Sequence, residues 1–299
     1  MNEPIWLEKN KVDNNKKYLK SVFFMSLSVV LFTCMIASIR IVSKEVDSLI
    51  IVFFRNFFGI IIIAPIIASH GIKLLKTTKT NLYFLRAFFG LLAMFTWFHG
   101  ITIVPLAEAV ALNFTMPLFI TLIATLFLAE KVGWRRWSAT IVGFSGAMIV
   151  LQPGIDALTI GHIELLAASF FMAISVIIIK KLSDTEPPAR IVAYMLIVFA
   201  PASLVPALFV WEWPSGNSLL WLAVVAISGT LAHLAFTRSL SMAEITAIMP
   251  LDFTRLPLTA LVAFLAFSEV PSLSTWIGGI IIFLSTVYIT HRESKLQKI

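Results

Sequence analysis

The sequence carries little charge. Asp, Glu, Lys and Arg make up only 13% of its 299 residues, about half the share in an average soluble protein. Apolar residues make up 59%, and the mean hydropathy is +0.94. A soluble domain of this composition would have to leave much apolar surface in water. These values exclude an ordinary soluble enzyme, a disordered chain and a fibrous repeat, and they indicate an all-α polytopic membrane protein.

Three kinds of chemical signature are also missing. The single cysteine, Cys34, cannot form a disulfide within the chain. We find no glycine motif for nucleotide phosphates, no cluster of His and Cys with metal-ligand spacing, and no set of catalytic nucleophile and base. The sequence therefore predicts no cofactor, no metal site and no enzymatic activity.

The apolar residues fall into ten segments, most of them near the ~20 residues that a helix needs to cross a bilayer. The predicted spans are 21–42, 48–69, 82–103, 106–128, 137–152, 161–181, 189–210, 218–240, 242–267 and 272–290. The connecting loops are too short for a soluble domain. The expected organisation is an arm (1–20), a first five-helix repeat (21–152), a connecting loop (153–160), a second five-helix repeat (161–290) and a tail (291–299).

The distribution of Lys and Arg predicts the orientation of these spans. With a cytoplasmic N-terminus, 18 of the 23 basic residues fall in cytoplasmic segments, two fall outside and three lie within spans. Basic residues collect on the cytoplasmic side of membrane proteins. We therefore expect both termini to be cytoplasmic in a multi-pass protein of the cell inner membrane. The net charge of +7 then needs no nucleic acid as a partner, and the sequence gives no signal for an oligomeric state.

The two halves of the chain resemble each other weakly. Asn-Phe-Thr at 113–115 matches Asp-Phe-Thr at 252–254, and Glu130 matches Glu269, each at an offset of 139 residues. Because each half has five spans, an odd number, the second half must enter the membrane with opposite polarity. Inverted repeats are typical of secondary transporters, with the substrate site between the halves. The alternative is chance similarity between apolar helices.

These motifs identify a family resemblance. The ten-span layout and the stretch AEAVALNFTMPLFITLIATLFLAEKV at 107–132 resemble the EamA type of the drug/metabolite transporter superfamily. The stretch at 82–117 looks like the S-adenosylmethionine uptake transporters of obligate intracellular bacteria. That resemblance implies import of S-adenosylmethionine, with exchange for S-adenosylhomocysteine. The alternative within the same fold is an exporter of amino acids, metabolites or cationic drugs.

Charged residues inside the spans are the first candidates for substrate contacts, because they are costly in a bilayer unless they line a pathway. Asp252 and Arg255 are three residues apart on one helix face. Asp252 would attract the cationic groups of the substrate, and Arg255 or Arg55 its carboxylate. The alternatives are a self-neutralising pair at Asp252 and Arg255, and a snorkelling Arg55. For Arg86, near the cytoplasmic end of its span, we expect snorkelling.

Four further polar residues are candidates for gating or proton relay. Glu108 and Glu244 occupy roughly inverted positions in the two halves, near opposite ends of their spans, and Glu108 is also a candidate contact for a cationic substrate. His99 and His233 lie within spans and titrate near neutral pH. The competing explanations are stabilisation of a helix N-terminus by the acids and hydrogen-bonded packing by the histidines.

The remaining candidates are uncharged. Asn113 and Phe114 lie close to Pro117, where a broken helix would leave a backbone carbonyl free beside a cavity. Trp97 and Phe114 could stack on an adenine ring. Aromatic residues are abundant in this chain, so the alternative for each is packing or contact with lipid.

Overall fold

The computed structural model describes residues 5–127, 134–151, 159–243, 248, 251–252 and 254–296. Within these residues every regular element is a helix, which confirms the all-α prediction. Six helices are long and apolar enough to cross a membrane. They are α1 (Ile5–Val42), α2 (Ser48–His70), α3 (Thr80–Ile103), α7 (Ile160–Ser183), α8 (Pro188–Leu208) and α9 (Gly216–Leu240).

The other regular elements of the described chain are shorter. They are the 3-10 turn η1 (Ile72–Leu75) and the helices α4 (Leu106–Asn113), α5 (Met116–Phe127), α6 (Trp134–Leu151), α11 (Arg255–Phe267) and α12 (Leu273–Leu296). Four apolar helical segments of 10 to 17 residues lie among these elements: Leu106–Ile120, Trp137–Val150, Arg255–Phe267 and Leu273–Ser285. The sequence predicted ten full spans. The described structure supports six of them as clear spans and has four shorter apolar segments besides.

The predicted span 106–128 is wrong as one continuous helix. The structure ends α4 at Asn113 and begins α5 at Met116. A proline ring clashes with the carbonyl four residues before it, and for Pro117 that residue is Asn113, where α4 stops. At the break, the carbonyl of Leu112 accepts from the backbone N–H of Thr115 at 3.0 Å and from its hydroxyl at 2.7 Å.

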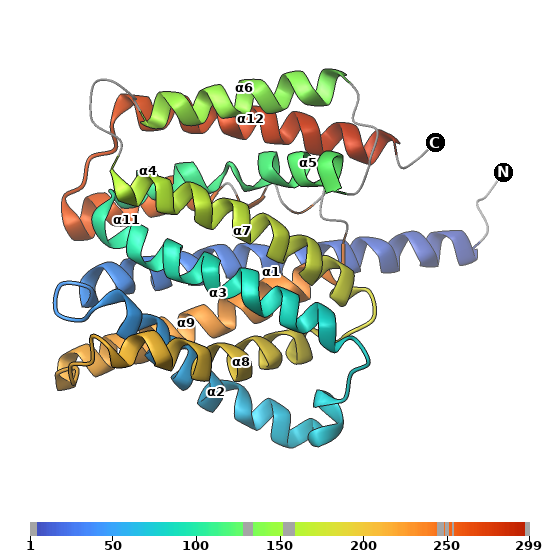
Figure 1. Cartoon of the computed structure of the whole chain (residues 1–299). Helices are drawn as coiled ribbons and strands as arrows, with labels where there is room; N and C mark the ends of the chain where they lie inside the picture. Colours follow the sequence, from blue (N-terminus) through green and yellow to red (C-terminus); the bar gives the residue numbers. More distant parts are fainter. Residues whose placement is uncertain are drawn as a thin grey trace.

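The helices pack in pairs that are far apart in the sequence. Helix α1 lies along α9, α3 along α7, α2 against α8 and α6 against α12 (Figure 1). The first three pairs are symmetric between the halves. If α1, α2 and α3 are exchanged with α7, α8 and α9, the pair α1/α9 becomes α7/α3, and the pair α2/α8 becomes itself. The start of α1 and the end of α12 lie at the same end of the bundle (Figure 1). The opposite polarity of the two repeats and the cytoplasmic termini stay predictions.

Two glycines bring α6 and α12 into close contact. A Cβ added to Gly278 would lie 2.5 Å from the carbonyl oxygen of Gly146, and one added to Gly146 would lie 2.9 Å from that of Gly278. Backbone atoms cannot turn aside as a side chain can. Small residues at such crossings are how helices pack closely in membranes.

We expect Gly278→Ala to lower the melting temperature of the detergent-solubilised protein by roughly 2–8 °C, because the added methyl group forces α6 and α12 apart. The measurement is thermal unfolding of the purified chain. Gly216→Ala is the matched control, since a Cβ there meets nothing within 4 Å. Equal melting temperatures for the two variants would contradict the close crossing.

Candidate functional site

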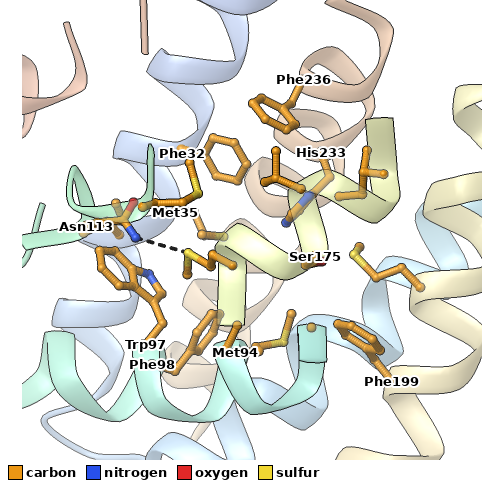
Figure 2. Close-up of a pocket in the computed structure, with 18 of the residues that line it drawn as sticks. Phe32, Met35, Met94, Trp97, Phe98, Asn113, Ser175, Phe199, His233 and Phe236 are labelled. Atoms are coloured by element: carbon orange, nitrogen blue, oxygen red, sulfur yellow. Dashed lines mark hydrogen bonds between the residues drawn. The ribbon is translucent and has the colours of Figure 1, made fainter. Parts of the chain in front are cut away.

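A cavity of about 140 Å³ lies in the middle of the bundle. Side chains from α1–α5, α7–α9 and α11 line it, whereas α6 and α12 contribute none of the described lining residues. Most of the wall is aromatic or thioether: Phe32, Trp97, Phe98, Phe199 and Phe236, with Met35, Met94, Met116, Met172 and Met195. Figure 2 shows Trp97, Phe98 and Met94 rising from α3, with Phe32 and Phe236 on the other side. Such a wall suits a flat, polarisable ligand.

Charged side chains complete the wall. Arg55, Arg86, Asp252 and Arg255 all line the cavity, together with His233. Arg55, Asp252 and Arg255 were predicted as substrate contacts, and the structure places all three in this cavity although Arg55 lies about 200 residues from the other two in the sequence. Three arginines face one aspartate, so two positive charges of the lining have no acidic counterpart within the described wall.

Arg55 lies in the interior of α2 with none of its surface exposed. Its Nη1 donates to the amide oxygen of the neighbouring Asn56 at 2.8 Å. Its Nε and Nη2 are buried and have no hydrogen-bond partner among the described residues. A fully buried guanidinium does not reach the membrane surface, so the snorkelling alternative for Arg55 is wrong.

Asp252 and Arg255 form an ion pair. The Arg255 Nη2 donates to Oδ2 of Asp252, one turn earlier in the chain. The guanidinium carbon of Arg255 also lies 5.5 Å from the centre of the Phe32 ring, within reach of a cation–π interaction. Oδ1 of Asp252 is buried without a partner in the described structure. The pair is therefore partly self-neutralising, and it leaves one carboxylate oxygen of a cavity-lining residue without a partner.

Arg86 was misassigned from the sequence. It was expected to snorkel, but it is only 3% exposed and lines the cavity. Its Nη2 lies 3.4 Å from the Met195 sulfur, and its Nε has no described partner. The available signal was helical spacing, because Arg86, Gly90 and Trp97 share one face of α3 and all three line the cavity.

The uncharged candidates divide into two groups. Trp97 is 4% exposed and lines the cavity, as does Asn113, whose amide nitrogen lies 3.2 Å from the Met172 sulfur (Figure 2). His233 projects from α9 with its ring edge-on to Phe32, at 5.1 Å between centroids. Phe114 is buried beside the break between α4 and α5, and it is absent from the described lining.

The remaining candidates lie away from the cavity. Glu108 hydrogen bonds with Nε2 of His162 at 2.8 Å, and His99 with Glu164 at 2.6 Å. Both contacts join helices of the first half to α7 at the end of the bundle where α3 ends. Glu244 lies outside the described residues.

A second polar network strengthens that same end of the bundle. Glu269, between α11 and α12, pairs with Arg40 of α1 at 2.9 Å and accepts from the backbone N–H of Leu106 at 2.9 Å. Arg40 also donates to the carbonyls of Ile101 and Thr102 at the end of α3. The first and second halves of the chain are thus held together here by charge-assisted hydrogen bonds.

The opposite end has its own contacts between the halves. Glu186, just before α8, pairs with Arg190 and accepts hydrogen bonds from Thr77 at 3.0 Å and Tyr83 at 3.4 Å. Near the start of the predicted first span, Ser21 of α1 donates to the backbone carbonyl of Ser239 on α9 at 2.9 Å. The cavity therefore lies between two sets of breakable polar contacts, one at each end.

Known proteins match this chain over most of its length. The model of the EamA-like transporter family matches residues 19–152 and again residues 159–291. An S-adenosylmethionine uptake transporter of Rickettsia felis is 32% identical over 95% of this chain and 96% of its own. A riboflavin transporter of Vibrio cholerae is 34% identical over 80% and 82%. A pseudopaline exporter of Pseudomonas aeruginosa is 27% identical over 92% and 98%.

The fold is also known from a solved structure. A crystal structure of another protein superposes with a TM-score of 0.65, covering 92% of this chain and 98% of that one, at 16% sequence identity. At this identity the similarity concerns the fold alone. The relatives named above are transporters, which agrees with the absence of an enzymatic signature in the sequence.

Proposed function

The chain belongs to the EamA-like transporter family, and we propose that it imports S-adenosylmethionine across the bacterial inner membrane in exchange for S-adenosylhomocysteine. Both termini would be cytoplasmic. The relative from Rickettsia felis, whose similarity extends over nearly the whole chain, supports this substrate. A member of the family with a different substrate would keep the same fold, so the side chains of the cavity must determine which substrate binds.

One observation carries the proposal: the cavity combines an aromatic wall with groups of both charge signs. S-adenosylmethionine has an adenine ring, a sulfonium, an ammonium and a carboxylate. Trp97 and the phenylalanines can stack on adenine, and Oδ1 of Asp252 is free to accept from the ammonium. The arginines can bind the carboxylate. S-adenosylhomocysteine lacks only the methyl group and its charge, so the same groups would bind it on the return step.

Alternating access follows from the contacts at the two ends of the cavity. Breaking the pairs Arg40–Glu269 and Glu108–His162 would open one end. Breaking the contacts of Glu186 would open the other. A carrier of this type rocks one half against the other around a central site. An exchanger needs no coupling ion, because the carrier reorients only when a substrate is bound, in each direction.

The second candidate is riboflavin transport. The relative from Vibrio cholerae has the higher identity over a shorter part of the chain, and a flavin ring would also fit between aromatic and thioether side chains. Riboflavin has no charged group at neutral pH, so the buried charges of the cavity would have no oppositely charged group on the ligand. Export, as named for the relative from Pseudomonas aeruginosa, is the same fold working in the other direction.

The test is thermal stabilisation of the purified chain by ligands, since a ligand that binds the native state raises its melting temperature. We expect S-adenosylmethionine and S-adenosylhomocysteine to raise it by a saturable amount, while riboflavin and adenosine leave it within error. Stabilisation by riboflavin alone would overturn the proposed substrate in favour of the second candidate. The Asp252→Asn variant should lose the stabilisation by S-adenosylmethionine.

A further inference from the structure

We infer that Arg55 and Arg86 together form a binding site for the anionic group of the substrate, a carboxylate. The inference rests on the proposed function and extends it, because it assigns the carboxylate to this pair and not to Arg255. The pair comes from two neighbouring helices of the first half, α2 and α3. Both side chains line the central cavity.

The burial of the pair is the first step. Arg55 is 0% exposed and Arg86 is 3% exposed, and each has a buried N–H donor with no partner among the described residues. The side-chain hydrogen bonds described for them go to the amide oxygen of Asn56 and the sulfur of Met195. A thioether is a weak acceptor. A buried cation without an acid is costly, and an anion supplied by the ligand would offset that cost.

The charges around the cavity favour Arg55 and Arg86, and not Arg255, as the groups that bind the carboxylate. Arg255 already has a carboxylate partner in Asp252. Arg55 and Arg86 line the same cavity, together with His233. No described acid neutralises them, so this side of the cavity is electropositive and attracts an anion.

The surroundings of Arg55 leave two of its guanidinium nitrogens without a hydrogen-bond partner. Gly229 of α9 faces it, and a Cβ on that glycine would lie 3.1 Å from Nε and 3.4 Å from Nη2. Any side chain at position 229 would fill the space beside the unpartnered nitrogens. Nε and Nη2 therefore have no acceptor from a side chain at position 229. These two donors lie on one edge of the guanidinium, the arrangement that binds a carboxylate in bidentate fashion.

The ligand class follows from both sides of the cavity. One anionic group next to a flat ring system fits an adenosyl amino acid such as S-adenosylmethionine or S-adenosylhomocysteine. A molecule that carries only positive charge, such as a cationic drug, would be repelled by two uncompensated arginines. A phosphate monoester is the other anion that an arginine pair would accept.

The experiment compares two ligands that differ by the carboxylate. Binding of S-adenosylmethionine and of its decarboxylated analogue is measured on the purified full-length chain, wild type and the variants Arg55→Gln and Arg86→Gln. We expect each variant to bind S-adenosylmethionine roughly tenfold to a hundredfold more weakly, and the analogue within about twofold of wild type. Arg238→Gln, an exposed arginine near the end of α9, is the control and should change neither.

Equal losses for both ligands would overturn the inference, because they would mean that the arginines act only on packing. The variants Arg55→Lys and Arg86→Lys keep the test decisive if a Gln variant does not fold, since the retained charge should preserve part of the preference for the carboxylate. A Lys variant that folds and shows no preference for either ligand also overturns it.

Failure of the proposed function would look different. If wild type binds neither adenosyl compound, riboflavin and riboflavin 5′-phosphate provide a second pair that differs by an anionic group. A preference for the phosphate that disappears in Arg55→Gln and Arg86→Gln would keep the anion site while replacing the substrate. Absence of any preference for the anionic member of that pair would remove the anion site as well.

Discussion

Asp252→Asn should reduce S-adenosylmethionine uptake by about a hundredfold at unchanged membrane abundance. Asp252 is the one acidic residue in the described wall of the cavity. Its Oδ2 pairs with Arg255 and its Oδ1 is buried without a partner. The substitution removes the attraction for the substrate's ammonium and sulfonium, and it adds an unpaired arginine to a cavity that is already positive. The measurement is the initial uptake rate in proteoliposomes.

A double variant separates two roles of Asp252. If this residue only neutralises Arg255, then Asp252→Asn combined with Arg255→Gln removes both charges and should restore uptake. We expect no restoration, because the cationic groups of the substrate would still lack a carboxylate. Recovery of uptake in the double variant, or normal uptake in the single one, would contradict a direct role in binding. Equal melting temperatures of the variants would show that folding is intact.

Glu269→Gln should open the end of the bundle that the Lys and Arg distribution places outside the cell. The carboxylate of Glu269 pairs with Arg40 and also accepts from the N–H of Leu106. Gln keeps an acceptor for the N–H but loses the charge that binds Arg40. We expect an impermeant maleimide added from outside to label a cysteine in the cavity roughly fivefold to tenfold faster.

The labelling experiment needs a defined thiol. Cys34, an exposed cysteine, is replaced by Ser, and Ser175 of the cavity wall is replaced by Cys. Asp184→Asn is the matched control, because it removes an exposed ion pair with Lys180 at the other end of the bundle. Identical labelling rates in the Glu269 variant and the control would contradict a gating role for the Arg40–Glu269 pair.

The sequence predicted much of the architecture because bilayer crossing imposes a strong and local pattern. Apolar runs near 20 residues predicted the six long helices, with boundaries within two residues of those observed except at the start of α1, which begins at Ile5 and not at 21. The family resemblance matches the EamA-like model over both halves. The break at 114–115 was harder to place, since apolar residues continue on both sides of it through 106–128. Only the position of Pro117, four residues after Asn113, marks where the helix must stop.

The candidate site was predicted less completely. Arg55, Asp252 and Arg255 were found because a charge within a span is expensive and therefore conspicuous. Arg86 was missed, since closeness to a predicted membrane boundary suggested snorkelling, and helix pairing that buries this end of α3 cannot be read from local sequence. Glu108 and His99 show the opposite case. They are polar and lie within predicted spans, but their partners are in α7, away from the cavity.

The most direct test is uptake of radiolabelled S-adenosylmethionine into proteoliposomes that contain the purified chain, with and without S-adenosylhomocysteine inside. The account predicts saturable uptake that becomes faster when S-adenosylhomocysteine is enclosed, because exchange returns the carrier in a loaded state. Folded protein that takes up no S-adenosylmethionine under either condition would contradict it.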